Sequence, residues 1–141
     1  MAAKSKPLSV RISTRTEQMI AAEARRTHRS KGAVIESLAE EALRARMFPG
    51  IAFRGEDFDR RPWVIGAALD IWQIVDTRRD FNSIEAMVAE GNLSERAIRL
   101  ALAYQESFPE EIEEAIALNR RPLAQLQAEY PFIGVHSADR P

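Results

Sequence analysis

The stretch that decides the fold runs from residue 7 to residue 46 and begins Leu8-Ser9-Val10-Arg11-Ile12-Ser13. Apolar and polar residues alternate strictly in these six positions, and a period of two is typical of a half-buried β-strand. Side chains alternate between the two faces of a strand. One face is therefore apolar, and the other carries Ser9, Arg11 and Ser13.

Two helices are expected directly after this strand. Thr14-Arg15-Thr16-Glu17 has the spacing of a capping box, so Thr14 is expected to cap a helix that runs to about Thr27. Ser30 is a favourable N-cap for a second helix that extends to residue 46. This second helix carries apolar residues at helical spacing: Val34, Ile35, Leu38, Ala42 and Leu43.

A homodimer is the simplest way to complete this unit. One short strand cannot pair with itself, and a module of about 40 residues is usually too small to be stable alone. Two strands would pair antiparallel across a two-fold axis, and four helices would cover their apolar face. The outer face of the ribbon would then show its polar side chains twice. A two-stranded ribbon fits the major groove of DNA, where arginine can bind guanine.

The ordered set of strand, capped helix and Arg29-Ser30-Lys31-Gly32 resembles the ribbon-helix-helix family of repressors and antitoxins. The resemblance covers residues 7–46. It implies that Ser9 and Arg11 read bases from the ribbon face that also holds Ser13. The family usually has a third base-reading residue on the outer face of the strand, before Ser9. That position is Pro7 in this chain. Arg11 as an ordinary solvated strand residue remains the alternative.

The resemblance also implies a phosphate contact at the start of the second helix. Backbone amides after Ser30, including that of Gly32, would hold a DNA phosphate with the help of Lys31. Lys31 as an ordinary lysine at a helix start is the alternative.

Charge is unevenly distributed in this chain of 141 residues, although its net charge is only −1. Residues 1–48 hold ten Lys/Arg and five Asp/Glu, a balance of +5, and residues 49–141 hold ten and sixteen, a balance of −6. A basic N-terminal part suits a polyanion. The acidic remainder suits a basic protein partner or simply keeps the helices soluble.

Several classes of protein are disfavoured. There is no cysteine, and the first six residues, read as a disordered basic arm, lack the apolar run of a signal peptide. The longest apolar stretch, residues 63–75, is too short to span a bilayer. A cytoplasmic protein without membrane association is expected. No phosphate loop, dinucleotide fingerprint, zinc-binding helix or nucleophile elbow occurs, so no catalytic residue, metal or cofactor is predicted.

The second half of the chain is expected to be mainly helical. Residues 47–61 read as a connector punctuated by Pro49, Gly50 and Gly55. A domain over 62–118 would open with a short β element and a turn at Gly66, and a C-terminal helix and tail would occupy 119–141. The expected helices are residues 71–79, 83–90, 95–107, 110–119 and 122–130. The predicted fold class is therefore mainly α, with a dimerising N-terminal module and a small second domain.

This second domain carries a resemblance of its own, over about residues 60–114. Two short helices joined at Gly91-Asn92-Leu93 have helix-turn-helix spacing. Four segments occur in order: Pro62-Trp63-Val64-Ile65-Gly66, Leu69-Asp70-Ile71, Leu93-Ser94-Glu95-Arg96-Ala97-Ile98 and Ala101-Leu102-Ala103-Tyr104. The set resembles a small domain of unassigned function found in many bacterial antitoxins. That domain usually has Thr-Arg after the glycine that corresponds to Gly66, whereas this chain has Ala67-Ala68. Arg96 and Arg99 would lie on the candidate recognition helix, where DNA contact, packing and dimerisation all remain open.

The antitoxin resemblance implies a toxin of the PIN-type ribonuclease class, in which clustered carboxylates hold a divalent metal. Arg120 and Arg121 form an adjacent basic pair, and Leu123 and Leu126 follow as apolar anchors. Arginine suits such a site because its guanidinium binds carboxylates in pairs. The alternative is that the two arginines cap the preceding helix.

The sequence therefore predicts a dimeric DNA-binding antitoxin that represses its own operon and blocks a co-encoded toxin. A stand-alone regulator with an oligomerising or sensing C-terminal domain is the second hypothesis, and an interaction protein without a DNA site is the third.

Overall fold

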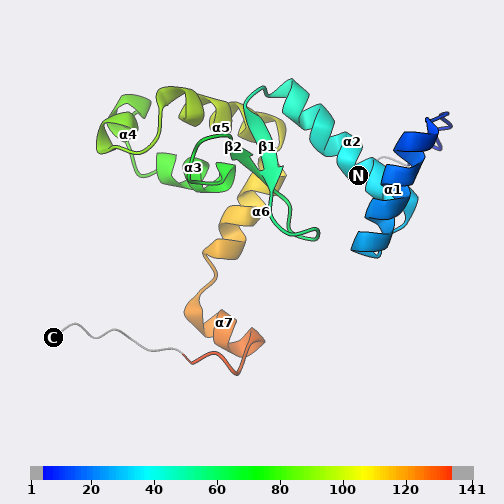
Figure 1. The fold of residues 1–141 in the computed structure, drawn as a ribbon. Helices are drawn as coiled ribbons and strands as arrows, with labels where there is room; N and C mark the ends of the chain where they lie inside the picture. The colour runs from blue at the N-terminus through cyan, green and yellow to red at the C-terminus, as the bar shows by residue number, and fades with distance from the viewer. Residues whose placement is uncertain (1–4, 135–141) are drawn as a thin grey trace.

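The structure is a computed structural model that describes residues 5–134 (Figure 1). This part of the chain contains seven helices and one two-stranded antiparallel sheet, which confirms the predicted mainly helical class with a short β element. The elements are α1 (Thr14–Thr27), α2 (Lys31–Met47), β1 (Ile51–Arg54), β2 (Arg61–Val64), α3 (Ile71–Arg78), α4 (Ile84–Glu90), α5 (Glu95–Ser107), α6 (Pro109–Asn119) and α7 (Leu123–Glu129). None of the helices within residues 5–134 has the length and apolar character needed to span a membrane.

The first two helices begin at serines. The Oγ of Ser13 accepts the N–H of Thr16 at 3.2 Å, so Ser13 caps α1 and the predicted cap at Thr14 is wrong. The backbone of Ser13 is already extended and so suited to a cap, whereas Thr14 lies inside the helix. Ser30 caps α2 as predicted, since its Oγ accepts the N–H of Ala33 at 3.1 Å. Between the helices, His28 adopts a left-handed conformation with φ 54°.

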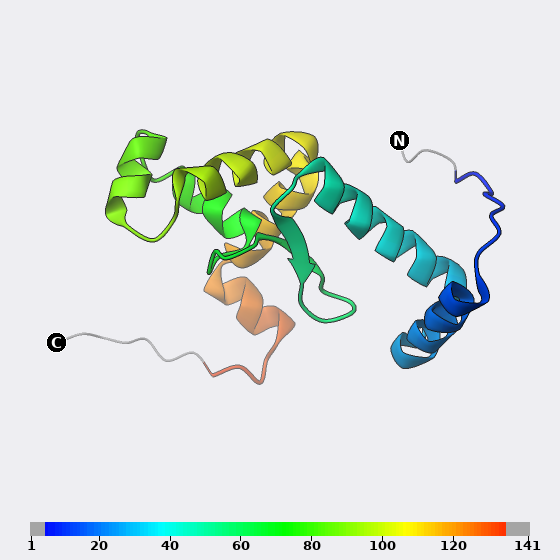
Figure 2. The same cartoon turned by 45° about the horizontal axis from the view of Figure 1, so that its top comes forward.

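The segment before α1 forms no strand within this single chain. Residues 5–13 extend away from the start of α1 without regular structure (Figure 2), and Leu8 is 85% exposed. A strand needs a partner to bond its backbone groups, so the ribbon and the two-fold dimer remain predictions. Most of the expected basic arm, residues 1–4, lies outside the described residues.

The expected connector over residues 47–61 is wrong, because it contains β1. This strand pairs with β2 in the register Ile51 with Val64 and Arg54 with Arg61. The side chains of Ile51 and Val64 are both buried in the core. A four-residue strand carries little periodic signal, and here it exists because β2 pairs with it.

The core lies among the sheet, α3, α5 and α6. Helix α3 packs against both α5 and α6, and α4 contacts α5 (Figure 2). The buried apolar residues of this core are Ile51, Val64, Ile71, Ile74, Val75, Met87, Ala97, Ile98, Ala101, Tyr104, Ile112 and Ile116. We call residues 48–119 the body and residues 5–47 the head.

Helix α7 stands apart from the body (Figure 1). It has no buried residue, and it begins at Leu123 after Pro122, which was expected inside the helix. Helix α6 begins at Pro109, one residue before its predicted start, since proline suits the first helical position. Helix α5 begins at Glu95 as predicted, and α4 begins at Ile84, one residue after its predicted start, because Ser83 is its N-cap.

Candidate nucleic-acid and partner interfaces

The three predicted base readers lie on the extended segment that leads into α1. Ser9, Arg11 and Ser13 are all exposed. Ser13 is partly committed to the helix start, because its hydroxyl also donates to Oγ1 of Thr16 at 3.0 Å. Arg11 has no ion pair among the described residues, so its guanidinium is available to a ligand.

The start of α2 is open to solvent at the predicted phosphate position. A Cβ built on Gly32 would meet no atom within 4 Å, so a phosphate can approach the backbone there. Nζ of Lys31 lies 2.7 Å from Oε1 of Glu17 on α1, and both side chains are about half exposed. Exposed ion pairs contribute little, so Lys31 can exchange this carboxylate for a phosphate.

The head presents apolar side chains that the rest of residues 5–134 leaves exposed. On α2, Ile35, Leu38, Leu43 and Met47 are exposed, whereas Val34, one turn before Leu38, is buried. Met19 of α1 and the apolar residues of the extended segment, Leu8, Val10 and Ile12, are exposed as well. Large exposed apolar patches mark interaction surfaces. This patch contains the residues that the sequence assigns to a dimer core.

Helix α2 is joined firmly to the body through Arg44. Its Nη1 donates to the phenolic oxygen of Tyr104 at 2.7 Å and to Oε2 of Glu111 at 2.5 Å, and Nη2 pairs with Glu40 at 2.6 Å. The guanidinium also lies 3.9 Å from the ring centroid of Phe108. The side chain of Arg44 is only 17% exposed. No local pattern in the sequence indicates this contact, because its partners are far apart in the chain.

The electrostatics of this contact favour a charged arginine beside a neutral tyrosine. Burial lowers the pKa of Arg44, but hydrogen bonds to Glu111 and Tyr104 outweigh burial and raise it overall. Burial also raises the pKa of Tyr104 to about 12, although the hydrogen bond from Arg44 acts in the opposite direction. The proton on Tyr104 is therefore retained well into the alkaline range.

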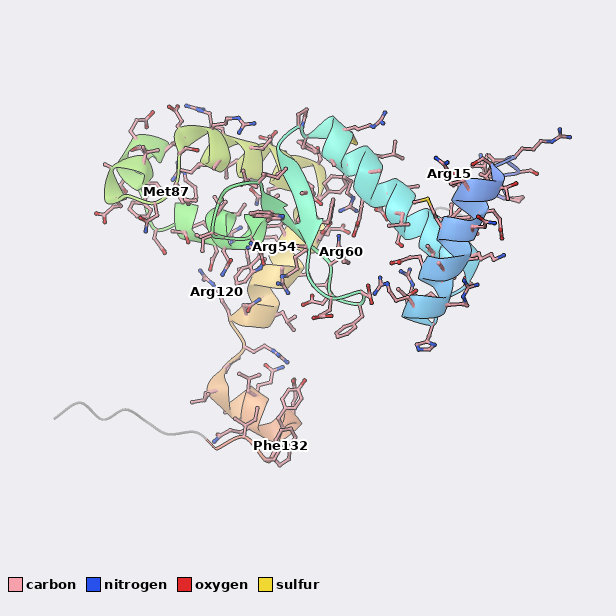
Figure 3. All side chains as sticks on the ribbon, in the orientation of Figure 1. Arg15, Arg54, Arg60, Met87, Arg120 and Phe132 are labelled. Atoms are coloured by element: carbon pink, nitrogen blue, oxygen red, sulfur yellow. The ribbon has the colours of Figure 1, made fainter. Side chains whose placement is uncertain are left out.

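A cleft of about 500 Å³ separates the head from the β1–β2 hairpin. Two exposed ion pairs cross it: Arg26 of α1 with Asp57 at 2.9 Å, and Arg60 with Glu41 of α2 at 2.9 Å. Hydrogen bonds from Arg26 lower the pKa of Asp57. Figure 3 shows Arg60 on the hairpin between the body and α2. The hairpin therefore contacts the head through these ion pairs and also packs on the core.

Arg96 and Arg99 lie on the exposed side of α5, in the body and not on the head. They border an open depression of about 560 Å³ whose other lining residues are Pro49, Glu95, Leu100 and Ala103. Arg99 pairs with Glu95 one turn earlier at 2.8 Å. Neither arginine lies on the surface that carries Ser9 and Arg11.

The two arginines of the predicted toxin contact bind within their own chain. Arg120 pairs with Asp76 of α3, and Nε of Arg121 donates to the carbonyl of Leu118 at 3.0 Å. Arg121 therefore binds a carbonyl at the end of α6, as the capping alternative expects. Leu123 is exposed and Leu126 is half-buried. Figure 3 shows Phe132 at the far end of this projecting segment.

One buried acidic residue also escaped the sequence analysis as a site of interest. Asp70 is buried and bonds Nε of Arg54 and Nε of Arg61, each at 2.8 Å, while its N–H donates to Gln73. These contacts satisfy the carboxylate inside the fold, so Asp70 holds the hairpin to α3. Within residues 5–134 no three histidine, cysteine or acidic side chains form a group suited to a metal ion. No protein-family model, curated protein or solved structure matches the chain.

Proposed function

We propose that the protein is a dimeric, sequence-specific DNA-binding antitoxin that represses its own operon and neutralises a co-encoded toxin. The observation that carries the proposal is the head. Its extended segment exposes alternating apolar and polar residues, and α2 exposes the apolar side chains of Ile35 and Leu38. A second copy supplies what both features lack, a strand to pair with and a surface that covers Ile35 and Leu38.

DNA recognition follows from this dimer. Pairing of the two segments places the apolar side chains of residues 8–12 against the helices and leaves Ser9 and Arg11 on the outer face. Each arginine then reaches a guanine edge in the major groove. The amides at the start of α2, with Lys31, hold the flanking phosphates. Arg96 and Arg99 are secondary candidates for a DNA contact.

Toxin binding is assigned to the projecting segment from Arg120 to Ile133. Helix α7 has no buried residue, and a helix of seven residues is marginal without packing. Its apolar side chains are therefore free to pack on a partner: Leu123, Leu126, Tyr130, Phe132 and Ile133. A PIN-type ribonuclease is the partner that the antitoxin resemblance suggests.

The decisive experiment has two parts. The first measures binding of the purified protein to the DNA upstream of its own coding sequence, at several salt concentrations and against unrelated DNA. The second co-expresses the protein with the product of the adjacent gene and tests for a complex and for relief of toxicity. Equal affinity for the upstream and the unrelated DNA at every salt concentration would exclude sequence-specific regulation by this protein.

A stand-alone regulator is the second candidate, and one observation favours it. Arg120 and Arg121 are paired within the chain, with Asp76 and with Glu129, and are less available to a toxin than free arginines. Selective DNA binding without any complex with the neighbouring gene product would support this alternative.

A further inference from the structure

Phe58 is the most exposed large apolar side chain of the body, at 92%. It lies at the tip of the β1–β2 hairpin, and this tip is well fixed. The guanidinium of Arg60 donates to the carbonyls of Phe53 and Gly55 at 3.1 Å each. An aromatic ring held out on a fixed loop binds with little loss of conformational entropy.

The hairpin tip is also acidic around the ring. Glu56, Asp57 and Asp59 flank Phe58. Asp57 and Asp59 pair with Arg26 and Arg61, whereas Glu56 has no ion pair among the described residues. A surface that receives this tip therefore needs an apolar floor and a positive rim.

The depression on α5 has these two properties. It is lined by the apolar residues Pro49, Leu100 and Ala103 and by three charged ones, Glu95, Arg96 and Arg99. Glu95 and Arg99 pair with each other at 2.8 Å, so the positive charge available to a ligand is that of Arg96. No ion pair involves Arg96 among the described residues, which leaves its charge uncompensated.

Gly50 shapes the edge of the depression. It has a φ of 106°, and a Cβ there would lie 2.9 Å from Nη2 of Arg96 and 3.0 Å from Cδ2 of Leu100. The missing side chain lets Arg96 and Leu100 lie against the backbone before β1.

The two surfaces cannot meet within one chain. Pro49 and Gly50 precede β1, and the loop that carries Phe58 follows it. The whole strand, which rises about 3.3 Å per residue, therefore separates them. Figures 1 and 2 both show this loop at the end of the sheet remote from α5.

We propose that Phe58 of one copy inserts into the α5 depression of a second copy, with Glu56 facing Arg96. A second copy is the occupant because the chain itself carries both halves, an apolar ring with acidic neighbours and an apolar floor with a basic rim. The contact is heterologous, because two different surfaces of the body meet. It can therefore repeat from copy to copy. It is small and weak by itself, and it gains strength where DNA holds copies side by side.

Disulfide trapping tests the contact directly, because the chain has no native cysteine. A Glu56→Cys chain is mixed with an Arg99→Cys chain, and the yield of the mixed disulfide is measured. The matched control replaces the second chain by Ala128→Cys, which is exposed on α7. The proposal requires faster trapping than in the control. It also requires at least about tenfold loss when Phe58→Ala is added to the first chain, as expected for a central aromatic anchor. Equal rates for both pairs, or no effect of Phe58→Ala, overturn it.

A charge exchange gives an independent readout without DNA, so a DNA contact by Arg96 does not affect it. Sedimentation of the wild type over a concentration series should show larger assemblies than Arg96→Glu shows. Combining Glu56→Arg with Arg96→Glu should restore them. Identical sedimentation of wild type and Arg96→Glu, or failure of the combined variant to recover, contradicts the proposal.

Discussion

Arg44 and Tyr104 are sixty residues apart in the chain, yet the guanidinium of Arg44 donates a 2.7 Å hydrogen bond to the phenolic oxygen of Tyr104. Phe48, one turn beyond Arg44, packs edge-on against the Tyr104 ring with centroids 5.4 Å apart. The end of α2 is therefore anchored to the body, whereas its first turns pack only against α1.

Removing the Tyr104 hydroxyl should change how stability depends on pH. The folded protein holds this proton more tightly, with a pKa of about 12 against 10.0 for an ordinary tyrosine. The resulting stabilisation is complete below pH 10 and is lost as the pH rises from about 10 to about 12. Two pKa units correspond to roughly 2–3 kcal/mol.

Denaturant unfolding of wild type and Tyr104→Phe between pH 8 and pH 12 measures this effect. The wild type should be more stable than Tyr104→Phe below pH 10, and this difference in the free energy of unfolding should shrink or reverse above pH 10. Tyr130→Phe, in the exposed segment after α7, is the control and should follow the wild type. Parallel curves for wild type and Tyr104→Phe would contradict the assignment.

Arg11→Ala should abolish selective DNA binding while the fold stays intact. The side chain is exposed, so its loss removes no core packing. Losing one good guanine contact costs roughly 1–3 kcal/mol, and a dimer loses two. Fluorescence anisotropy with upstream and unrelated DNA measures the loss, and circular dichroism checks the fold. Arg25→Ala, at the far end of α1, controls for general loss of positive charge. If Arg11→Ala binds as tightly as wild type, Arg11 does not read bases.

Leu38→Glu should convert the dimer to monomer. Leu38 is 48% exposed in the single chain, and the proposed dimer buries it, where an unpaired carboxylate is costly. Leu118→Glu is the matched control, because Leu118 is 56% exposed on α6, away from the head. Analytical ultracentrifugation should show a monomer for Leu38→Glu and a dimer for Leu118→Glu. Val10→Glu should behave like Leu38→Glu. A dimeric Leu38→Glu protein would place the interface elsewhere.

Deleting residues 122–141 should separate the two proposed activities. Helix α7 buries no residue, and this deletion keeps Arg120 and its pair with Asp76. DNA binding by the head should therefore survive, and neutralisation of the toxin should fail. The double variant Arg120→Ala and Arg121→Ala in the full chain then tests whether toxin neutralisation depends on the two charges or on the apolar side chains of the segment. Full neutralisation by the truncated protein would move the toxin contact to residues 60–114.

Much of the secondary structure could be predicted because its signals are local. Ser30 caps α2 at the predicted place, since a serine hydroxyl close to the free amides of the first turn is a purely local signal. The cap at α1 was misplaced by one residue because Ser13 and Thr14 are both good caps. The extended conformation of Ser13 decides between them.

The candidate surfaces were predicted only in part. The alternation in residues 8–13 identified an apolar face, and the structure leaves that face exposed. The positions of Arg120 and Arg121 were predicted as a basic pair, but their partners Asp76 and Glu129 were not. A sequence shows which charges a chain carries, whereas the distance between two charges depends on how distant helices pack.

The sequence by itself determined where the helices lie, the cap at Ser30 and the alternation before α1, because these features depend on residues within a few positions of one another. Only the tertiary structure decided that Ile51–Arg54 is a strand, that Arg44 joins α2 to Tyr104 and Glu111, and that Phe58 and the α5 depression lie at opposite ends of one hairpin. Each of these depends on chain segments that fold onto one another from far apart. The free energy of such contacts comes from burial and pairing that no local pattern records.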